Sequence, residues 1–318
     1  MKLSTPVTVD NTGFTLDHAN ASLLVGSCFT EYMGERMQAL RFPVCLNPFG
    51  ILYNPLSMAE ALSRCLDNKP LTADELVQHD GLWHSWLHHG SFSQPDRDAC
   101  LNACNDAIRQ AHVFLQRCDR MVLTFGSAWY FVEKTSRRIV ANCHKLPAAN
   151  FDRHLASADD IVAVWNPLLD RLASAGIEVL FTISPVRHWA YGPHGNHIGK
   201  APLFLAVDTF CSSRRAQCHY FPAYEIMMDE LRDYRFYADD MLHPSPLAQD
   251  IIWQRFQEAY MSPDTIGLCN MVDKLNRLRQ HRMLHPSDEA CARHQALVDA
   301  QQQQVEEMLS RYNKSPKL

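Results

Sequence analysis

A short apolar run that ends in Gly26-Ser27 constrains this chain more than any other part of its sequence. Residues 22–25 form a continuous apolar stretch typical of a buried strand, and from Phe29 onward apolar residues recur at every fourth position, as on one face of a helix. In open α/β proteins, a turn from strand to helix lies at the carboxyl edge of a parallel sheet, where ligands bind. The run therefore predicts a parallel sheet with the Ser27 hydroxyl at its ligand-binding edge.

Similar strand-like runs recur along the chain, with amphipathic segments between them. Strands are expected at residues 22–25, 42–46, 121–125, 177–183 and 219–221. Buried strands that alternate with helices favour right-handed crossovers and a doubly wound parallel sheet. With 318 residues, the chain is long enough for one α/β domain of this kind with appendages.

Three segments depart from this alternation. Residues 67–98, which are rich in aromatic residues and histidine, and residues 184–204, which are rich in Gly and Pro, are expected to be insertions, the second a long loop. From about residue 263 the composition becomes polar. We expect an α/β domain over residues 1–262 and a helical extension over residues 263–318, through which the chain could form a homo-oligomer.

Charge and cysteine usage limit the partners and the compartment. The formal net charge is −5, so nucleic acid is not an expected partner. The chain has no apolar run of the ~20 residues that span a membrane and no export-signal pattern, so no membrane association is expected. None of the eleven cysteines forms a Cys-x-x-Cys pair, which favours a reducing compartment and predicts a cytoplasmic protein.

A second motif, Asp240-Met-Leu-His243, precedes the last expected helix of the α/β domain. A serine becomes a nucleophile when a histidine accepts its proton and a carboxylate orients that histidine. We expect Ser27 to attack, His243 to act as base and then acid, and Asp240 to orient His243, with Asp239 as a less compact alternative. The competing interpretation is that Ser27 only caps a helix and that Asp240 only forms a turn.

Several segments resemble one known family. Gly26-Ser-Cys-Phe-Thr30 is similar to the signature of the GSCFA family, with Thr30 in place of alanine. The similarity continues over residues 47–55, 81–90, 123–129, 142–145, 184–188 and 237–245. This family is regarded as part of the SGNH/GDSL-like hydrolase superfamily. The resemblance implies a flavodoxin-like three-layer α/β/α sandwich, the Ser27–Asp240–His243 triad and no cofactor.

The resemblance also suggests where an oxyanion would bind. SGNH hydrolases use the N–H of the nucleophile, a glycine N–H and an asparagine side chain, which the resemblance places at Gly50 and at Asn54 or Asn47. The family-like segment at Gly126 lacks the asparagine of the usual third block. Asn142 and His144 are alternative donors.

The histidine-rich loops offer further candidates. His89, His144 and His188 lie in family-like segments near strand ends, where they could line a substrate pocket or only anchor a loop. The histidines at 84, 88, 89, 194 and 197 lack the usual spacing of helical metal-binding motifs, so no metal is expected. A metal-dependent hydrolase that uses them is a rival hypothesis. Trp83, Trp86, Trp129 and Trp189 could stack on carbohydrate, but core or lid packing is the favoured interpretation.

These observations predict a serine-dependent hydrolase of a small-molecule or carbohydrate-linked acyl ester, of the esterase or deacetylase type. An acyltransferase would use the same residues and differ only in excluding water from the acyl-enzyme. A non-catalytic α/β binding module is a third hypothesis, which the altered third block favours.

Overall fold

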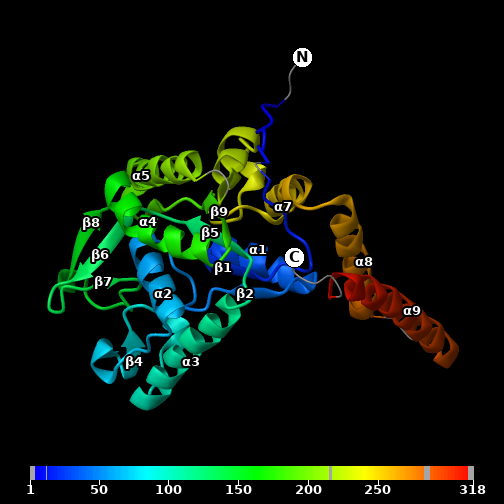
Figure 1. Cartoon of the computed structure of the whole chain (residues 1–318), viewed down its shortest axis with the longest axis horizontal. Coiled ribbons are helices and arrows are strands. Elements are labelled where there is room, and N and C mark those ends of the chain that lie inside the picture. Colours follow the sequence, from blue (N-terminus) through cyan, green and yellow to red (C-terminus); the bar gives the residue numbers. More distant parts are fainter. Residues whose placement is uncertain (1–3, 12, 215–216, 283–286, 314–318) are drawn as a thin grey trace.

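A five-stranded parallel sheet forms the centre of the molecule (Figure 1). The computed structural model describes residues 4–11, 13–214, 217–282 and 287–313. The strands are β1 (Ser22–Gly26), β2 (Val44–Leu46), β5 (Arg120–Phe125), β9 (Glu178–Ile183) and β10 (Cys218–Phe221), in the order β10-β9-β5-β1-β2. Renumbered along the chain, this is the 2-1-3-4-5 order of flavodoxin-like folds. The predicted parallel sheet is confirmed.

Helices cover both faces of this sheet, because its inner strands are apolar on both sides. In β1, Leu23 and Val25 belong to one buried cluster and Leu24 belongs to the other. The first cluster includes residues from α2 (Pro55–Asp67), α3 (Arg97–Leu115), α4 (Ala158–Ser174) and α5 (Gly192–Ser213). The second includes residues from α1 (Cys28–Ala39) and α7 (Pro246–Tyr260). The predicted three-layer α/β/α sandwich is confirmed.

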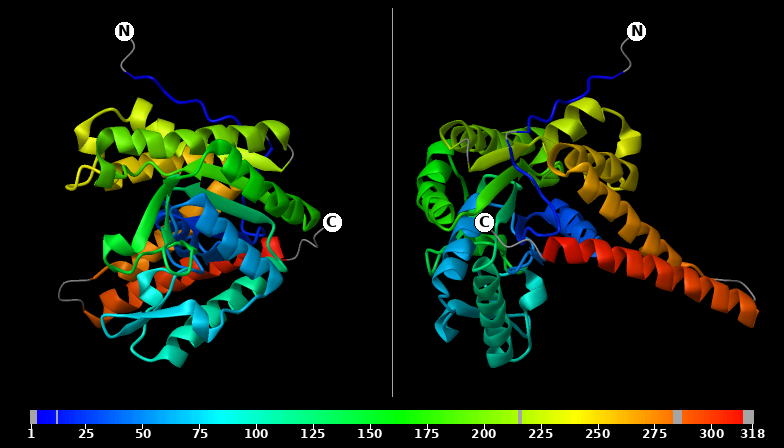
Figure 2. Two further views of the ribbon diagram at one scale, coloured as in Figure 1. Left: turned by 90° about the vertical axis from the view of Figure 1, so that its left-hand side faces the viewer. Right: turned by 45° about the vertical axis from the view of Figure 1, so that its right-hand side comes forward.

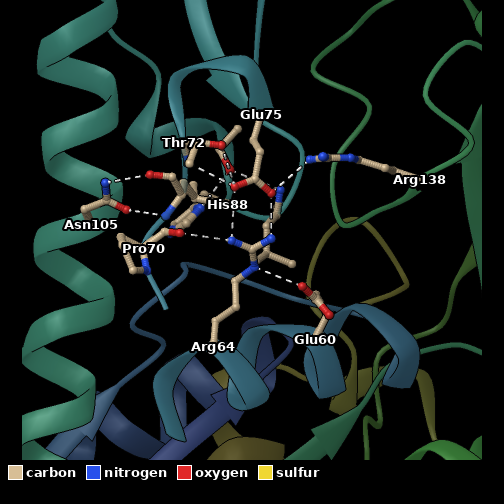
Figure 3. A network of polar contacts seen from close by, with 11 residues as sticks. Glu60, Arg64, Pro70, Thr72, Glu75, His88, Asn105 and Arg138 are labelled. Carbon is tan, nitrogen blue, oxygen red and sulfur yellow. Dashed lines mark hydrogen bonds and ion pairs between the residues drawn. The ribbon is translucent and has the colours of Figure 1, made fainter. Parts of the chain in front are cut away.

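The insertion at residues 67–98 packs against α2 and α3. It contains the short helix η1 (Ala73–Glu75), a hairpin of β3 (Leu76–His79) and β4 (Leu82–Ser85), and η2 (Gly90–Phe92). Figure 3 shows the polar network that fastens it: the Glu75 carboxylate accepts from Arg64 at 2.6 Å and from Arg138 at 2.9 Å. Burial alone would raise the pKa of Glu75, but the Arg64 guanidinium and the Thr72 N–H hold it below its usual range.

The prediction of a long loop over residues 184–204 is wrong beyond residue 191, because α5 begins at Gly192. Proline is compatible with the first turn of a helix, where Pro193 lies. Gly199 is required by packing: a Cβ there would lie 2.7 Å from Ser127 Oγ and from Trp129 Cδ1. The glycine that suggested a loop is thus a point of close contact between helix and sheet edge.

A second, antiparallel sheet lies beside the carboxyl edge of the main sheet. It has the order β7-β6-β8 and consists of β6 (Trp129–Glu133), β7 (Ile139–Val140) and β8 (Phe151–Leu155). The sequence analysis did not predict it. The remaining short turns are η3 (Ala148–Asn150), η4 (Trp189–Tyr191), α6 (Ala223–Glu225), η5 (Ile226–Glu230) and η6 (Tyr234–Phe236).

Two helices, α8 (Pro263–Gln280) and α9 (Asp288–Asn313), follow the α/β domain. Figure 2 shows them side by side and extending away from the sheet. Val298 and Val305 of α9 are buried in the same cluster as residues of α8. The division at residue 263 remains a prediction, and residues 314–318 of the expected extension lie outside the described residues. Across the described ranges, no helix is both long and apolar enough to cross a membrane.

Candidate active site

Ser27 lies directly after β1, between β2 and β5, where the strand order of the sheet reverses. Asn47 fixes this turn, because its Oδ1 accepts from the Gly26 N–H at 2.9 Å. A Cβ on Gly26 would lie 2.6 Å from the Thr124 carbonyl oxygen, so only glycine fits between the two strands. Ser27 itself is 1% exposed.

The Ser27 hydroxyl contacts both the helix that follows it and a second serine. Its Oγ accepts from the Phe29 N–H at 3.3 Å and so caps α1, and it donates to Ser184 Oγ at 3.1 Å. Ser184 follows β9, and the Val186 N–H donates to its Oγ at 3.3 Å. The helix-cap interpretation therefore describes one of the contacts of Ser27, and a cap does not prevent the oxygen from reacting.

A buried lysine lies behind this pair of serines. Lys200 of α5 is 2% exposed, and its Nζ donates to the Ser184 carbonyl oxygen at 2.6 Å. Burial lowers the pKa of Lys200 to about 7, and the nearby Cys28 thiol opposes this shift. The sequence analysis missed both Ser184 and Lys200 as site residues.

The expected carboxylate–imidazole pair is present. His243 Nδ1 lies 2.5 Å from Asp240 Oδ2, and Asp240 Oδ1 accepts from the N–H groups of Leu242 at 2.9 Å and His243 at 3.0 Å. These backbone bonds, together with the His243 ring, lower the pKa of Asp240 to about 2. Asp240, and not Asp239, is the carboxylate beside His243, and it is ionised at neutral pH.

Ser27 and His243 line one cavity of about 470 Å³ at the carboxyl edge of the sheet. No hydrogen bond joins the two side chains within the ranges that the structure describes. Four other predicted residues also line this cavity, namely Asn54, Gly126, Asn142 and His188, and so do Trp129 and Trp189.

The possible oxyanion donors differ in how far they are already engaged. The Gly126 N–H donates to the Tyr53 carbonyl oxygen at 2.8 Å. Asn54 caps α2 through its Oδ1, and its Nδ2 donates one hydrogen to Ser57 Oγ at 3.0 Å. The Oδ1 of Asn142 accepts from the His144 N–H at 2.8 Å. Each of the two asparagine amides keeps at least one N–H that these contacts do not use.

The structure places Gly50, His89 and His144 outside the cavity lining. The Gly50 N–H donates to the Asn47 carbonyl oxygen at 2.7 Å, and a Cβ on Gly50 would lie 2.3 Å from that of His89. His89 caps η2. His144 is buried with Nε2 2.8 Å from the Ser85 carbonyl oxygen, and burial lowers its pKa to about 4. The geometry gives these three residues structural contacts away from this cavity, and their site roles remain a prediction.

The histidine-rich segments do not converge on one centre. His84 stacks on His144, whereas His194 and His197 lie on α5. Among the residues with described positions, no group of three or more His, Cys, Asp and Glu side chains is arranged to hold a metal ion.

The fold and the cavity define a flavodoxin-like α/β protein that presents a serine and an Asp–His pair at the switch point of its sheet. The model of the GSCFA family matches residues 22–256, and the chain belongs to this family. No curated protein matches the chain. One similar solved structure is the psychrotrophic esterase EstA from Pseudoalteromonas sp., inhibited by monoethylphosphonate. It has 11% identity and a TM-score of 0.35, and the match covers 76% of this chain and 96% of that chain.

Proposed function

We propose that this protein is a serine-dependent hydrolase of acyl esters that works through a covalent Ser27 acyl-enzyme. The observation that supports this proposal most is that Ser27 and the Asp240-bound His243 line the same cavity at the switch point of the sheet. Membership of the GSCFA family agrees with it. The proposed substrates are small-molecule or carbohydrate-linked acyl esters, for which Trp129 and Trp189 offer aromatic surface in the lining.

In the proposed reaction, Ser27 Oγ attacks the acyl carbon and its proton passes to His243 Nε2. Asp240 holds Nδ1–H, which leaves Nε2 as the accepting nitrogen. The bond to the alcohol then breaks, and the alcohol leaves with the proton from His243. Water, deprotonated by His243, attacks the acyl-enzyme; the acid departs and Ser27 regains its proton. Before the first step Ser27 must turn from Ser184 toward His243, in line with the tightening of catalytic hydrogen bonds on substrate binding.

The negative charge on the substrate oxygen needs donors aimed at it, each worth roughly 3–4 kcal/mol of the barrier. The amides of Asn54 and Asn142 are the proposed side-chain donors, because both line the cavity and both have an N–H to spare.

Intact-mass measurement after incubation with a fluorophosphonate tests the proposal. Wild type should gain one phosphonate, mapped to Ser27, whereas Ser27→Ala and His243→Ala should gain none. Asp240→Asn should label more slowly by a factor on the order of 10⁴, because the wrong imidazole tautomer is then favoured. Ser91→Ala, which changes an exposed serine outside the cavity, serves as the matched control.

Labelling that persists in Ser27→Ala would contradict the assignment of the nucleophile. Folded wild type that never labels would favour the non-catalytic binding module. If the acyl-enzyme forms but resists water and reacts with an added alcohol, the protein is an acyltransferase with the same residues.

A further inference from the structure

The cavity around Ser27 carries a single fixed charge. Of the described side chains that line it, only Arg187 is a lysine, arginine, aspartate or glutamate. The others are apolar, aromatic or neutral polar groups, together with His188 and His243. The lining itself therefore presents one permanent cation to a ligand, and the Asp240 carboxylate lies behind it, bound to His243.

The guanidinium of Arg187 is held by neutral groups. Its Nε lies 3.5 Å from Tyr237 Oη and its Nη2 lies 3.3 Å from Met228 Sδ, and its Cζ lies 5.8 Å from the centre of the Tyr237 ring. Within the described ranges it makes no ion pair with a carboxylate. Arg187 is half-buried, so its guanidinium can still be reached by a ligand, and it has donors that no carboxylate of the protein occupies.

Other half-buried arginines of this protein are paired with carboxylates. Arg64 binds Glu75 at 2.6 Å and Arg255 binds Glu230 at 2.6 Å. Arg187 differs from them because, within the described ranges, no carboxylate is bound to its guanidinium.

The backbone of Arg187 is fixed relative to the Asp240–His243 pair. Its N–H donates to the carbonyl oxygen of Leu242, the residue before His243, at 3.2 Å. Arg187 also lines a neighbouring cavity of about 650 Å³, whose lining includes Tyr237 and Met228, the two partners of its guanidinium. That lining holds a second arginine, Arg232, together with the carboxylates of Asp233 and Asp240, so its positive and negative charges cancel. The cavity that contains Ser27 is thus the better site for a negative group.

We propose that Arg187 determines specificity by binding an anionic group, a carboxylate or a phosphate, on the ester that Ser27 cleaves. This inference rests on the proposed function and adds the substrate class to it. A guanidinium offers a planar fork of donors that matches these oxyanions. A bound anionic group would give the Arg187 guanidinium the negatively charged partner that no side chain of the described residues supplies.

Two matched pairs of esters test the proposal and distinguish the side of the ester that carries the charge. 4-Nitrophenyl hemisuccinate has its anion on the acyl group, and 4-acetoxybenzoate has it on the alcohol; their methyl esters are the neutral partners. Wild type should show the higher kcat/KM for the anionic member of at least one pair. Arg187→Met should lower that preference, the ratio of kcat/KM for the anionic ester to kcat/KM for its neutral partner, on the order of 10- to 100-fold.

Two further variants separate charge from packing. Arg187→Lys keeps the charge but not the fork, so it should retain part of the preference. Arg235→Met removes an exposed arginine outside both cavities and should leave the preference unchanged. Equal kcat/KM for anionic and neutral esters in wild type, or the same preference in wild type and Arg187→Met, would overturn the proposal.

A binding measurement keeps the inference independent of turnover. Monomethyl succinate should bind wild type in calorimetry, with dimethyl succinate and Arg187→Met as neutral-ligand and neutral-protein controls. If no ester is hydrolysed but only the anion binds, and only when Arg187 is present, the proposed hydrolase is wrong and the anion site is right. Equal binding of the two succinates, or binding of neither, would refute the anion site.

Discussion

Replacing Lys200 with methionine should remove a pH dependence of stability that originates in its buried ammonium group. Burial lowers the pKa of Lys200 to about 7 in the folded protein, whereas its ordinary value is 10.5. Between these two values the unfolded chain holds more protons than the folded protein, so the free energy of unfolding rises with pH. Well below pH 7 both states are protonated, and the contribution of Lys200 is constant.

The size of the effect follows from the two pKa values. One pKa unit corresponds to about 1.4 kcal/mol, so Lys200 should raise the free energy of unfolding by about 1.5 kcal/mol between about pH 7 and pH 8.5. At higher pH the buried thiols oppose this trend. Burial raises the pKa of Cys65 and Cys118 to about 12, so these groups lose their protons first in the unfolded chain, and stability then falls with pH.

Urea denaturation followed by far-ultraviolet circular dichroism, in steps from pH 7 to pH 8.5, measures this contribution. The gain in wild type should exceed the gain in Lys200→Met by about 1.5 kcal/mol, since the other titrating groups are the same in both proteins. Lys274→Met, which changes an exposed lysine of α8, should behave like wild type. If Lys200→Met gains as much stability as wild type over this range, Lys200 is not a titrating buried cation and the reasoning fails.

Two substitutions away from the reacting atoms give further predictions. Gly26→Ala places a Cβ 2.6 Å from the Thr124 carbonyl oxygen. We therefore expect the free energy of unfolding, measured by urea denaturation, to fall by about 3 kcal/mol and phosphonate labelling to become slower. If neither value changes, the close-contact argument is wrong. Glu75→Gln removes the carboxylate shared by Arg64 and Arg138 and should lower the free energy of unfolding by on the order of 2 kcal/mol at pH 7. Because the folded-state pKa of Glu75 is lowered, wild type loses this contribution as pH falls below the usual glutamate range, so an equal cost at pH 3 and pH 7 would contradict it.

The main sheet could be predicted because its strands are buried on both faces and read as continuous apolar runs. The second strand begins two residues later than expected, at Val44. Pro43, just before it, has no N–H to donate. β8, with the sequence Phe-Asp-Arg-His-Leu, gives no such signal, because most of its residues are exposed and polar.

In the candidate site, too, residues that lie in local motifs could be located from the sequence, whereas residues placed by tertiary packing could not. The positions of Ser27, Asp240 and His243 follow from local motifs at a strand end and a turn, and their catalytic roles stay a prediction. The placing of Gly50 and His144 depends on how distant loops meet, which one sequence does not reveal. Lys200 lies in the segment predicted to be a long loop, and its burial follows only from the packing of α5 against the sheet edge.

That Ser27 caps α1 has a consequence for the proposed intermediate. An ester at Oγ has no proton to donate, so acylation would break the bond to Ser184, but the oxygen keeps a lone pair for the Phe29 N–H. The first turn of α1 would therefore persist through the catalytic cycle, with the positive end of the helix dipole beside the acyl group. Ser27→Ala, in contrast, removes the cap, and about 1 kcal/mol of stability should be lost with it. In that variant, loss of the nucleophile and loss of the helix cap therefore occur together. Ser27→Asn, which keeps a capping oxygen but has no nucleophilic hydroxyl, offers a way to separate them.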